Sequence, residues 1–263
     1  IASIGVGLAG VGPRALGMRE EIGKRLSERF GCPVGVWNDA EAALAGALCQ
    51  GGPGVLLIGG TGSSALGFDG RSRVTLMGGW GRSLRDAGSA YELFQRFAQL
   101  LLLAEEEGEA GFERGPRDAL LAELGLEDPK GLIALFARGP EPKEIEICGR
   151  VLFEAAETGD DLALELLEES GEDLLELALR CEKALGLGGP VPLFLHGGLL
   201  ERDGPVRRSL ERGLASREGS LLTVQEPDLG AEAGAALLQC DALRATALRG
   251  LRLAFDRGVE APG

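Results

Sequence analysis

Two aspartates are the side chains in this sequence best suited to acid–base chemistry. Asp39 follows an apolar segment at residues 33–37, and Asp86 follows a glycine-rich segment that ends at Gly81. A carboxylate can act as a general base that takes the proton from an attacking hydroxyl group. It can also accept hydrogen bonds from a polyol. Taken alone, each aspartate is more often a helix cap or a surface residue.

A glycine-rich turn at residues 59–63 (Gly-Gly-Thr-Gly-Ser) is suited to holding an anion. Its glycine N–H groups can be approached closely, and Thr61 and Ser63 add hydroxyl donors. The chain carries 27 basic and 41 acidic residues, a formal net charge of -14, so a phosphate ligand would need such an uncharged cradle. The turn alone is equally consistent with a plain hairpin.

Two further glycine-rich segments contain a ring side chain. Trp80 stands among the glycines of residues 78–81, where an indole ring could pack on the apolar face of a sugar or fill a core between domains. His196 precedes Gly197 and Gly198, where an adenine or a ribose could lie flat on the backbone. The alternative for His196 is a turn with a hydrogen-bonded histidine.

Several common catalytic motifs are not supported. Residues 5–10 spell Gly-x-Gly-x-x-Gly, but a dinucleotide fold expects an acidic residue about 20 residues further on, and Asp39 follows Gly10 by 29 residues. These glycines therefore favour a tight turn between a strand and a helix. Neither a Walker loop nor a Gly-x-Ser-x-Gly motif occurs. The five cysteines form no Cys-x-x-Cys pair and His196 is the sole histidine, which disfavours zinc and iron–sulfur sites.

The elements that must position these residues alternate between strand and helix near the start of the chain. We predict strands at residues 1–8 and 33–37 and helices at residues 13–30 and 40–49. Two such strands form a parallel pair with a crossover helix. Asp39 then stands at the carboxyl end of the second strand, where ligands of such sheets bind.

The composition changes at residues 51–54 (Gly-Gly-Pro-Gly), which we interpret as a boundary between domains at residues 1–50 and 51–263. An antiparallel meander of three strands is expected directly after this boundary. The remaining predicted elements are strands at residues 55–58, 65–68, 73–77, 191–195 and 221–224, helices at 91–104, across 118–185 and from 229, and an exposed loop at 105–116.

The overall composition is that of a globular protein, with 44% hydrophobic and 26% charged residues. No apolar run reaches the roughly 20 residues of a membrane span, and the negative charge disfavours nucleic acid and anionic lipid as partners. Scattered, unpaired cysteines are typical of a reducing cytoplasm. We therefore expect a cytoplasmic α/β protein that binds small molecules, and a homodimer is compatible with these features.

The order of the motifs resembles the N-acetylglucosamine kinase branch of the BadF/BadG/BcrA/BcrD ATPase family, within the sugar kinase/Hsp70/actin superfamily. The resemblance covers about residues 4–240. It is carried by Val-Trp-Asn-Asp at 36–39, Gly-Thr-Gly-Ser at 60–63, Gly-Gly-Trp-Gly at 78–81, Asp-Ala-Gly-Ser at 86–89 and His-Gly-Gly at 196–198. The second and third of these segments are the most specific.

The resemblance implies two ribonuclease-H-like (actin-like ATPase) domains around a cleft, with the last helix packing back on the first domain. It implies a kinase that uses ATP and Mg²⁺ to phosphorylate a hydroxyl, the 6-hydroxyl, of N-acetylglucosamine or a related amino sugar. Asp39 would be the catalytic base. The implied nucleotide-binding residues are Gly60, Thr61, Gly62, Ser63, Gly197 and Gly198, and the implied sugar-binding residues are Asn38, Gly79, Trp80 and Asp86.

The sequence departs from the family pattern in two places. The family begins with a glycine-rich phosphate loop that carries an acidic residue for magnesium, ahead of the first strand predicted here. The first domain is therefore expected to be incomplete at its N-terminus, and the metal ligands are unknown. Where relatives often have Gly-Asp-Glu-Gly-Ser, residues 85–89 are Arg-Asp-Ala-Gly-Ser. The added Arg85 would suit an anionic or differently substituted sugar.

Two other functions are compatible with the same fold. One is an ATPase activator of the acyl-CoA dehydratase type, which shares an iron–sulfur cluster between subunits through cysteines, whereas the cysteines here form no evident pair. The other is a non-catalytic relative that binds sugar or nucleotide. Calorimetry with ATP and N-acetylglucosamine distinguishes a ligand-binding protein from one that binds neither.

Overall fold

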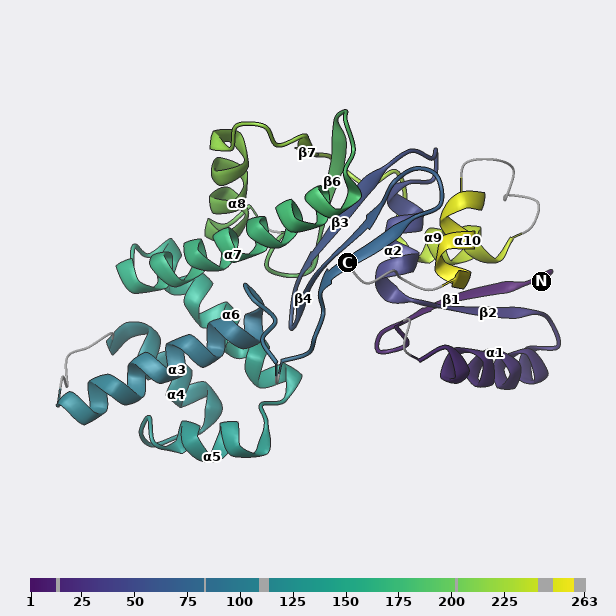
Figure 1. Ribbon diagram of the computed structural model, residues 1–263. Helices are drawn as coiled ribbons and strands as arrows, with labels where there is room; N and C mark the ends of the chain where they lie inside the picture. Colours follow the sequence, from purple (N-terminus) through teal and green to yellow (C-terminus); the bar gives the residue numbers. More distant parts are fainter. Residues whose placement is uncertain (13–14, 83, 109–113, 202, 241–247, 258–263) are drawn as a thin grey trace.

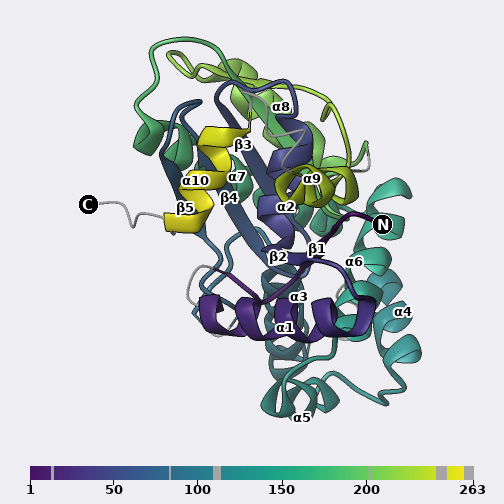
Figure 2. The same ribbon diagram turned by 90° about the vertical axis from the view of Figure 1, so that its right-hand side faces the viewer.

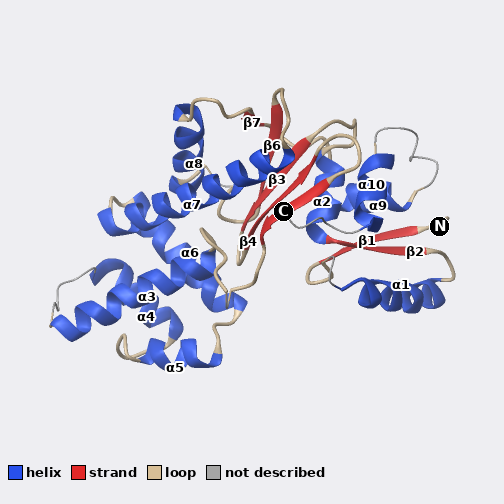
Figure 3. Ribbon diagram, viewed as in Figure 1, coloured by secondary structure: helices blue, strands red, loops and turns tan. Residues whose placement is uncertain are grey.

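A computed structural model describes residues 1–12, 15–82, 84–108, 114–201, 203–240 and 248–257 (Figure 1). Helices flank two β-sheets (Figure 3). Among these residues, no helix combines the length and apolarity that crossing a lipid bilayer requires. The elements are, in chain order, β1 (Ile4–Leu8), α1 (Leu16–Phe30), β2 (Val34–Asn38), α2 (Asp39–Ala47), β3 (Gly54–Gly59), β4 (Ser63–Phe68), β5 (Val74–Gly78), α3 (Ala90–Glu107), α4 (Arg114–Leu124), α5 (Gly131–Arg138), α6 (Pro142–Glu157), α7 (Asp161–Leu185), β6 (Val191–His196), α8 (Pro205–Ser216), β7 (Leu222–Val224), α9 (Ala231–Gln239) and α10 (Arg249–Arg257).

The described strands form two separate sheets. β1 and β2 are parallel neighbours, with Val6 opposite Val36. The second sheet has the strand order β5-β4-β3-β6-β7. In it, β3, β4 and β5 form an antiparallel meander, while β6 lies parallel to β3 and β7 lies parallel to β6. The parallel pair and the meander predicted from the sequence are both confirmed.

Helices separate the two sheets. α2, α9 and α10 lie between the β1–β2 pair and the five-stranded sheet (Figure 1). α1 covers the other side of β1 and β2 (Figure 2). α7 packs on the opposite face of the five-stranded sheet, where Leu174, Leu177 and Leu185 are buried, as their helical spacing predicts. The two sheets therefore face one shared helical layer.

Small residues let α2 and α9 approach closely within this layer. A Cβ atom at Gly234 of α9 would lie 1.9 Å from the carbonyl oxygen of Ala42 in α2. A Cβ atom at Gly46 of α2 would lie 2.4 Å from the carbonyl oxygen of Gly230. Only glycine fits at these two positions, so the contact between α9 and α2 depends on them.

We expect Gly234→Ala to lower the free energy of unfolding by about 1–3 kcal/mol, because the added methyl group forces two packed backbones apart. Urea denaturation measures the change. Gly149→Ala in α6 is the matched control, since a Cβ atom there meets nothing within 4 Å. The control should gain up to about 1 kcal/mol from its helix propensity. Equal unfolding midpoints for the two variants would contradict the packing described above.

Some of the predicted boundaries are wrong. The loop expected at residues 105–116 is shorter, because α3 continues to Glu107 and α4 begins at Arg114; residues 109–113 lie outside the described residues. Pro13, expected to open α1, also lies outside them. The helical stretch predicted across residues 118–185 is divided into α4, α5, α6 and α7, and neither α8 nor α10 was predicted.

Candidate active site

The segments predicted to bind nucleotide and sugar begin at one end of the five-stranded sheet. β3, β5 and β6 run in the same direction, because β4 is antiparallel to both β3 and β5, and β6 is parallel to β3. These three strands end at Gly59, Gly78 and His196. Three segments therefore leave the sheet at the same end, beyond the carboxyl ends of these strands: the turn at residues 60–63, the segment from Gly79 and the segment from Gly197. Such folds bind ligands at this end.

The segment that follows β5 holds the last residue of the turn at residues 60–63. The Gly79 amide donates to the carbonyl oxygen of Ser63 at 2.9 Å. Thr61 is exposed, and a Cβ atom at Gly60 would meet nothing within 4 Å. Open space therefore lies beside Gly60 and Thr61, as the approach of a phosphate chain to this turn requires.

Asp86 is a buried carboxylate next to this turn, with 7% of its surface exposed. The Gly81 amide donates to Asp86 Oδ1 at 3.0 Å, and the amides of Trp80 and Ser63 also donate to the carboxylate. Burial raises the pKa of Asp86 above its ordinary value, and the amide hydrogen bonds oppose that rise without cancelling it. Asp86 therefore links residues 78–81, the tryptophan-bearing segment, to residues 60–63, the predicted phosphate turn.

Close packing against Asp86 explains one glycine of the turn. A Cβ atom at Gly62 would lie 2.7 Å from Asp86 Oδ2.

Trp80 itself is 62% exposed, so its ring is available to a ligand. A carboxylate has about four acceptor positions, which leaves room for the contact between Asp86 and a sugar hydroxyl that the resemblance implies.

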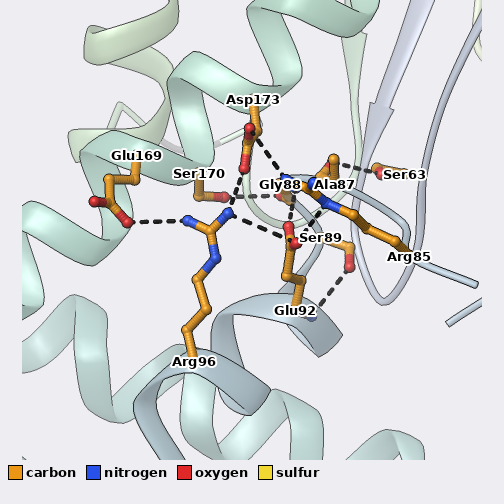
Figure 4. A network of polar contacts seen from close by, with 10 residues as sticks. All are labelled: Ser63, Arg85, Ala87, Gly88, Ser89, Glu92, Arg96, Glu169, Ser170 and Asp173. Carbon is orange, nitrogen blue, oxygen red and sulfur yellow. Dashed lines mark hydrogen bonds and ion pairs between the residues drawn. The ribbon is translucent and has the colours of Figure 1, made fainter. Parts of the chain in front are cut away.

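Three side chains fix the backbone that follows Asp86 (Figure 4). They come from β4, α7 and α3: Ser63 Oγ donates to the Ala87 carbonyl at 2.7 Å, Ser170 Oγ donates to the Gly88 carbonyl at 2.8 Å, and Glu92 Oε2 accepts from the Gly88 amide at 2.7 Å. Ser63 and Ser170 are both buried. The position of Asp86 is thus set by elements on both sides of the loop.

Arg85 belongs to an ion-pair network at the outer side of this loop (Figure 4). Its Nε donates to Glu92 Oε1 at 3.0 Å, and its Nη2 lies 3.8 Å from Asp173 Oδ1. Arg96 binds the same two carboxylates, with Nη2 2.7 Å from Asp173 Oδ2. Arg85 has a left-handed φ of 91° and its side chain is 62% exposed. To meet an anionic sugar, it would have to exchange these carboxylates for the ligand.

Asn38 and Asp39 stand at the junction between β2 and α2. Asn38 Oδ1 accepts from the Ala40 amide at 3.1 Å, and Glu41 Oε2 accepts from the Asn38 amide at 2.9 Å. This reciprocal arrangement is a capping box. It leaves Asp39 exposed as the first residue of α2, directly beyond the carboxyl end of β2.

The direction of α2 brings Asp39 to the same end of the molecule as the phosphate turn. A Cβ atom at Gly54, where β3 begins, would lie 2.9 Å from the side chain of Leu48, which follows α2. α2 contacts β3 and shares a hydrophobic cluster with it. The start of α2 therefore points towards the end of β3, where residues 60–63 turn (Figure 1).

Gly197 and Gly198 lie at the same end of the sheet. They follow β6, which neighbours β3 on the side opposite β4. Gly197 has a φ of 98°, and a Cβ atom there would lie 2.6 Å from the Gly59 carbonyl oxygen, so glycine is required. A Cβ atom at Gly198 would meet nothing within 4 Å. His196 Nδ1 lies 3.0 Å from Glu201 Oε1, which also accepts from the Gly197 amide at 3.0 Å.

Direct contacts thus join the phosphate turn, Trp80, Asp86 and Gly197 into one cluster. Across the described part of the chain, no hydrogen bond or ion pair connects Asp39 to this cluster. Asp39 and this cluster are related only by lying at the same end of the described structure.

The sequence-based prediction does not include three residues of this region: Glu92, Ser170 and Asp173. Ser89 precedes Glu92 at the spacing of a capping box, and its Oγ accepts from the Glu92 amide at 3.2 Å, so this spacing could have identified Glu92. Ser170 and Asp173 lie in the middle of α7 and have no comparable local signal.

Known proteins are similar to this chain in sequence. The BadF/BadG/BcrA/BcrD ATPase family matches residues 1–239. An N-acetylmuramic acid/N-acetylglucosamine kinase of Clostridium acetobutylicum is 33% identical over 141 residues, which cover 53% of this chain and 45% of that protein. An N-acetyl-D-glucosamine kinase of Dictyostelium discoideum is 30% identical over 174 residues, which cover 64% of this chain and 54% of that protein. The chain spans about half the length of the curated relatives it matches.

Solved structures share the fold. A protein of Chromobacterium violaceum described as an N-acetylglucosamine kinase has a TM-score of 0.66 and 28% identity, covering 89% of this chain and 74% of its own. A protein of Porphyromonas gingivalis has a TM-score of 0.60 and 24% identity, covering 88% and 74%, and supports the fold alone. With the family match over most of its length, this α/β chain belongs to the BadF/BadG/BcrA/BcrD ATPase family.

Proposed function

We propose that this chain acts as an ATP-dependent kinase that transfers the γ-phosphoryl group to a hydroxyl, the 6-hydroxyl, of N-acetylglucosamine or a related amino sugar. The two curated relatives, both amino-sugar kinases by name, support this proposal. The observation that carries it is geometric. The ends of β3, β5 and β6 and the start of α2 lie at one end of the molecule, which supports a shared ligand site for the turn at residues 60–63 and the Asp39 carboxylate.

We further propose that residues 1–50 and 51–263 form two actin-like domains around a cleft. The separation of the β1–β2 pair from the five-stranded sheet supports this division. A Cβ atom at Gly5 of β1 would lie 2.0 Å from the carbonyl oxygen of Ala235 in α9. This close contact supports a closing helix that packs back on the first domain.

In the proposed reaction, Asp39 takes the proton from the sugar hydroxyl while the oxygen of that hydroxyl bonds to the γ-phosphorus. The bond from that phosphorus to the bridging oxygen breaks, and ADP leaves with the bond's electron pair. The backbone amides of Thr61 and Gly62 and the hydroxyl of Thr61 hold phosphate oxygens, because the Gly60 amide already donates to the Gly62 carbonyl and the Ser63 amide to Asp86. Gly197 and Gly198 support the adenosine. Phosphoryl transfer depends mainly on such positioning and charge stabilisation.

Magnesium is a further implication of the resemblance. Within the described residues, no three His, Cys, Asp or Glu side chains gather as a metal site. The side chains of this part of the chain therefore provide no cage of their own. Mg²⁺ stays a prediction, as the counter-ion of the ATP phosphates.

Product analysis tests the proposed function. The protein, as its gene encodes it, is incubated with ATP and with N-acetylglucosamine, N-acetylmuramic acid or glucose. We expect ADP and a sugar 6-phosphate in equal amounts with an N-acetylated sugar, the position being assigned by NMR. ADP without a phosphorylated sugar would overturn the kinase, whereas phosphate on another hydroxyl would overturn only the 6-hydroxyl assignment.

Trp80→Ala should weaken sugar binding by about tenfold, the loss expected for removing one aromatic contact. ATP affinity should stay unchanged, because the substitution keeps the Trp80 backbone amide that donates to Asp86. Calorimetry with each ligand measures both affinities. Trp80→Phe should restore most of the binding, and Leu103→Ala, at a half-exposed position on α3, is the control for loss of an exposed apolar side chain. An unchanged sugar affinity in Trp80→Ala would remove the ring from the sugar site.

Two of the five cysteines are unsuited to the iron–sulfur cluster of an ATPase activator. Cys148 and Cys181 lie in the hydrophobic core, where burial raises the pKa of both thiols, that of Cys181 to about 12. Thiols that stay protonated are poor ligands for a cluster.

A further inference from the structure

A buried ion pair connects α1 to the start of α2. Arg19 and Glu41 are only 7% and 2% exposed. The two guanidinium nitrogens each meet a carboxylate oxygen, Nη2 donating to Oε1 at 2.9 Å and Nη1 lying 2.8 Å from Oε2. Arg19 Nε donates to the carbonyl oxygen of Val11, in the connection that follows β1. One side chain thus ties the connection after β1 to the helix after β2.

The same carboxylate reaches the residue before Asp39. Glu41 Oε2, which faces Arg19 Nη1, also accepts from the Asn38 amide at 2.9 Å. The Asn38 side chain in turn accepts from the Ala40 amide at 3.1 Å. The backbone on both sides of Asp39 is therefore held by one chain of hydrogen bonds that begins at Arg19.

Stability alone is a weak reason for this arrangement. Burying two charges costs desolvation energy that a well-packed apolar pair avoids. A bidentate guanidinium–carboxylate pair does, however, fix direction as well as distance. Here the direction that it fixes is that of the carboxylate holding Asn38.

We infer that Arg19 is a positioning residue, which acts through Glu41 to hold Asn38 and so to aim Asp39 at the sugar hydroxyl. The inference rests on the proposed function. It assigns no contact between Arg19 and a substrate. A displacement of about 1 Å in a reacting group can lower a rate by about 100-fold, so loss of this hold should be visible in kcat.

Two double variants separate positioning from simple stabilisation. R19M/E41Q and R19M/E41M both remove the two buried charges. Glutamine keeps an oxygen that accepts from the Asn38 amide, as in a capping box, whereas methionine has none. We expect kcat of R19M/E41M to be at least about tenfold below that of R19M/E41Q, with an unchanged KM for ATP. Equal kcat values per folded molecule would overturn the inference.

Further variants guard against misfolding and general charge effects. Arg19→Lys keeps the charge but loses the bidentate geometry, and we expect an intermediate kcat with a near-normal melting temperature. Arg25→Met on the same helix removes the partner of Glu21 in an exposed ion pair, whose side chains are 75% and 55% exposed. This control should leave kcat unchanged, and a loss equal to that of Arg19→Lys would overturn the specific role of Arg19.

Amide hydrogen exchange tests the inference independently of catalysis. Exchange at residues 38–41 should be faster in R19M/E41M than in R19M/E41Q. If the unaltered protein phosphorylates no sugar, the proposed function fails, and the exchange comparison still decides whether Glu41 holds this segment. Equal exchange in the two double variants would overturn the inference.

Discussion

Asp39→Ala should lower kcat for sugar phosphorylation by about 10²- to 10⁴-fold, the usual contribution of a general base. Sugar affinity should change little, because the neighbouring Asn38 and the tryptophan-bearing segment remain. Asp39 is exposed at the start of α2, and among the described residues its Oδ1 accepts only from the adjacent Ala40 amide, so we expect Asp39→Ala to fold normally. Steady-state kinetics and calorimetry measure the two effects.

Asp161→Ala is the matched control for this variant. Asp161 is an exposed aspartate and the first residue of α7, as Asp39 is of α2. The control should retain full kcat. Turnover retained in Asp39→Ala would exclude Asp39 as the base, and an equal loss of kcat in the control would show that any helix-start aspartate has this effect.

Asp86→Ala should lower both sugar affinity and turnover, with kcat/KM falling by about 100-fold because the phosphate turn and the tryptophan-bearing segment lose their common anchor. The amides of Gly81, Trp80 and Ser63 would each lose a buried acceptor. An unsatisfied buried group costs about 1–3 kcal/mol, so the variant should also be less stable. Asp86→Asn keeps one carbonyl oxygen and should be affected less.

Asp69→Ala distinguishes the site from general turn stability. Asp69 Oδ1 accepts from three backbone amides in the turn between β4 and β5, at the end of the sheet opposite residues 60–63: Arg71 at 2.8 Å, Ser72 at 2.9 Å and Arg73 at 3.0 Å. Its loss should lower the melting temperature and leave kcat/KM unchanged. Equal kinetic losses in the two variants would contradict the anchoring role of Asp86.

Local signals in the sequence were sufficient for the elements that carry the site. Glycine, proline and apolar runs delimit β1 to β5. The crossover connection predicted the parallel pairing of β1 and β2, and the short turns predicted the antiparallel pairing of β3, β4 and β5. α8 was missed although Pro205 opens it and Val206 and Leu210 are buried one turn apart. α10 was missed as well, although Leu251, Ala254 and Phe255 are buried at helical spacing.

The residues of the candidate site were predicted as a set whose binding roles stay a prediction, whereas the contacts among them were not predicted. The motif order grouped the phosphate turn with Trp80 and Asp86, yet burial of Asp86 among backbone amides has no signature in sequence. The bond from Ser170 to Gly88 joins positions 82 residues apart. The hold of Arg19 on Glu41 spans 22 residues. Such contacts arise from tertiary packing, which periodicity and spacing do not encode.

A crystal structure with N-acetylglucosamine and a non-hydrolysable ATP analogue tests the central claim most directly. We predict that the sugar 6-hydroxyl lies about 3 Å from a carboxylate oxygen of Asp39, within hydrogen-bond reach. We also predict that the terminal phosphate contacts the amides of Thr61 and Gly62, which have no hydrogen-bond partner within the described turn. A sugar held away from Asp39, or a phosphate chain bound at another edge of the molecule, would contradict the account.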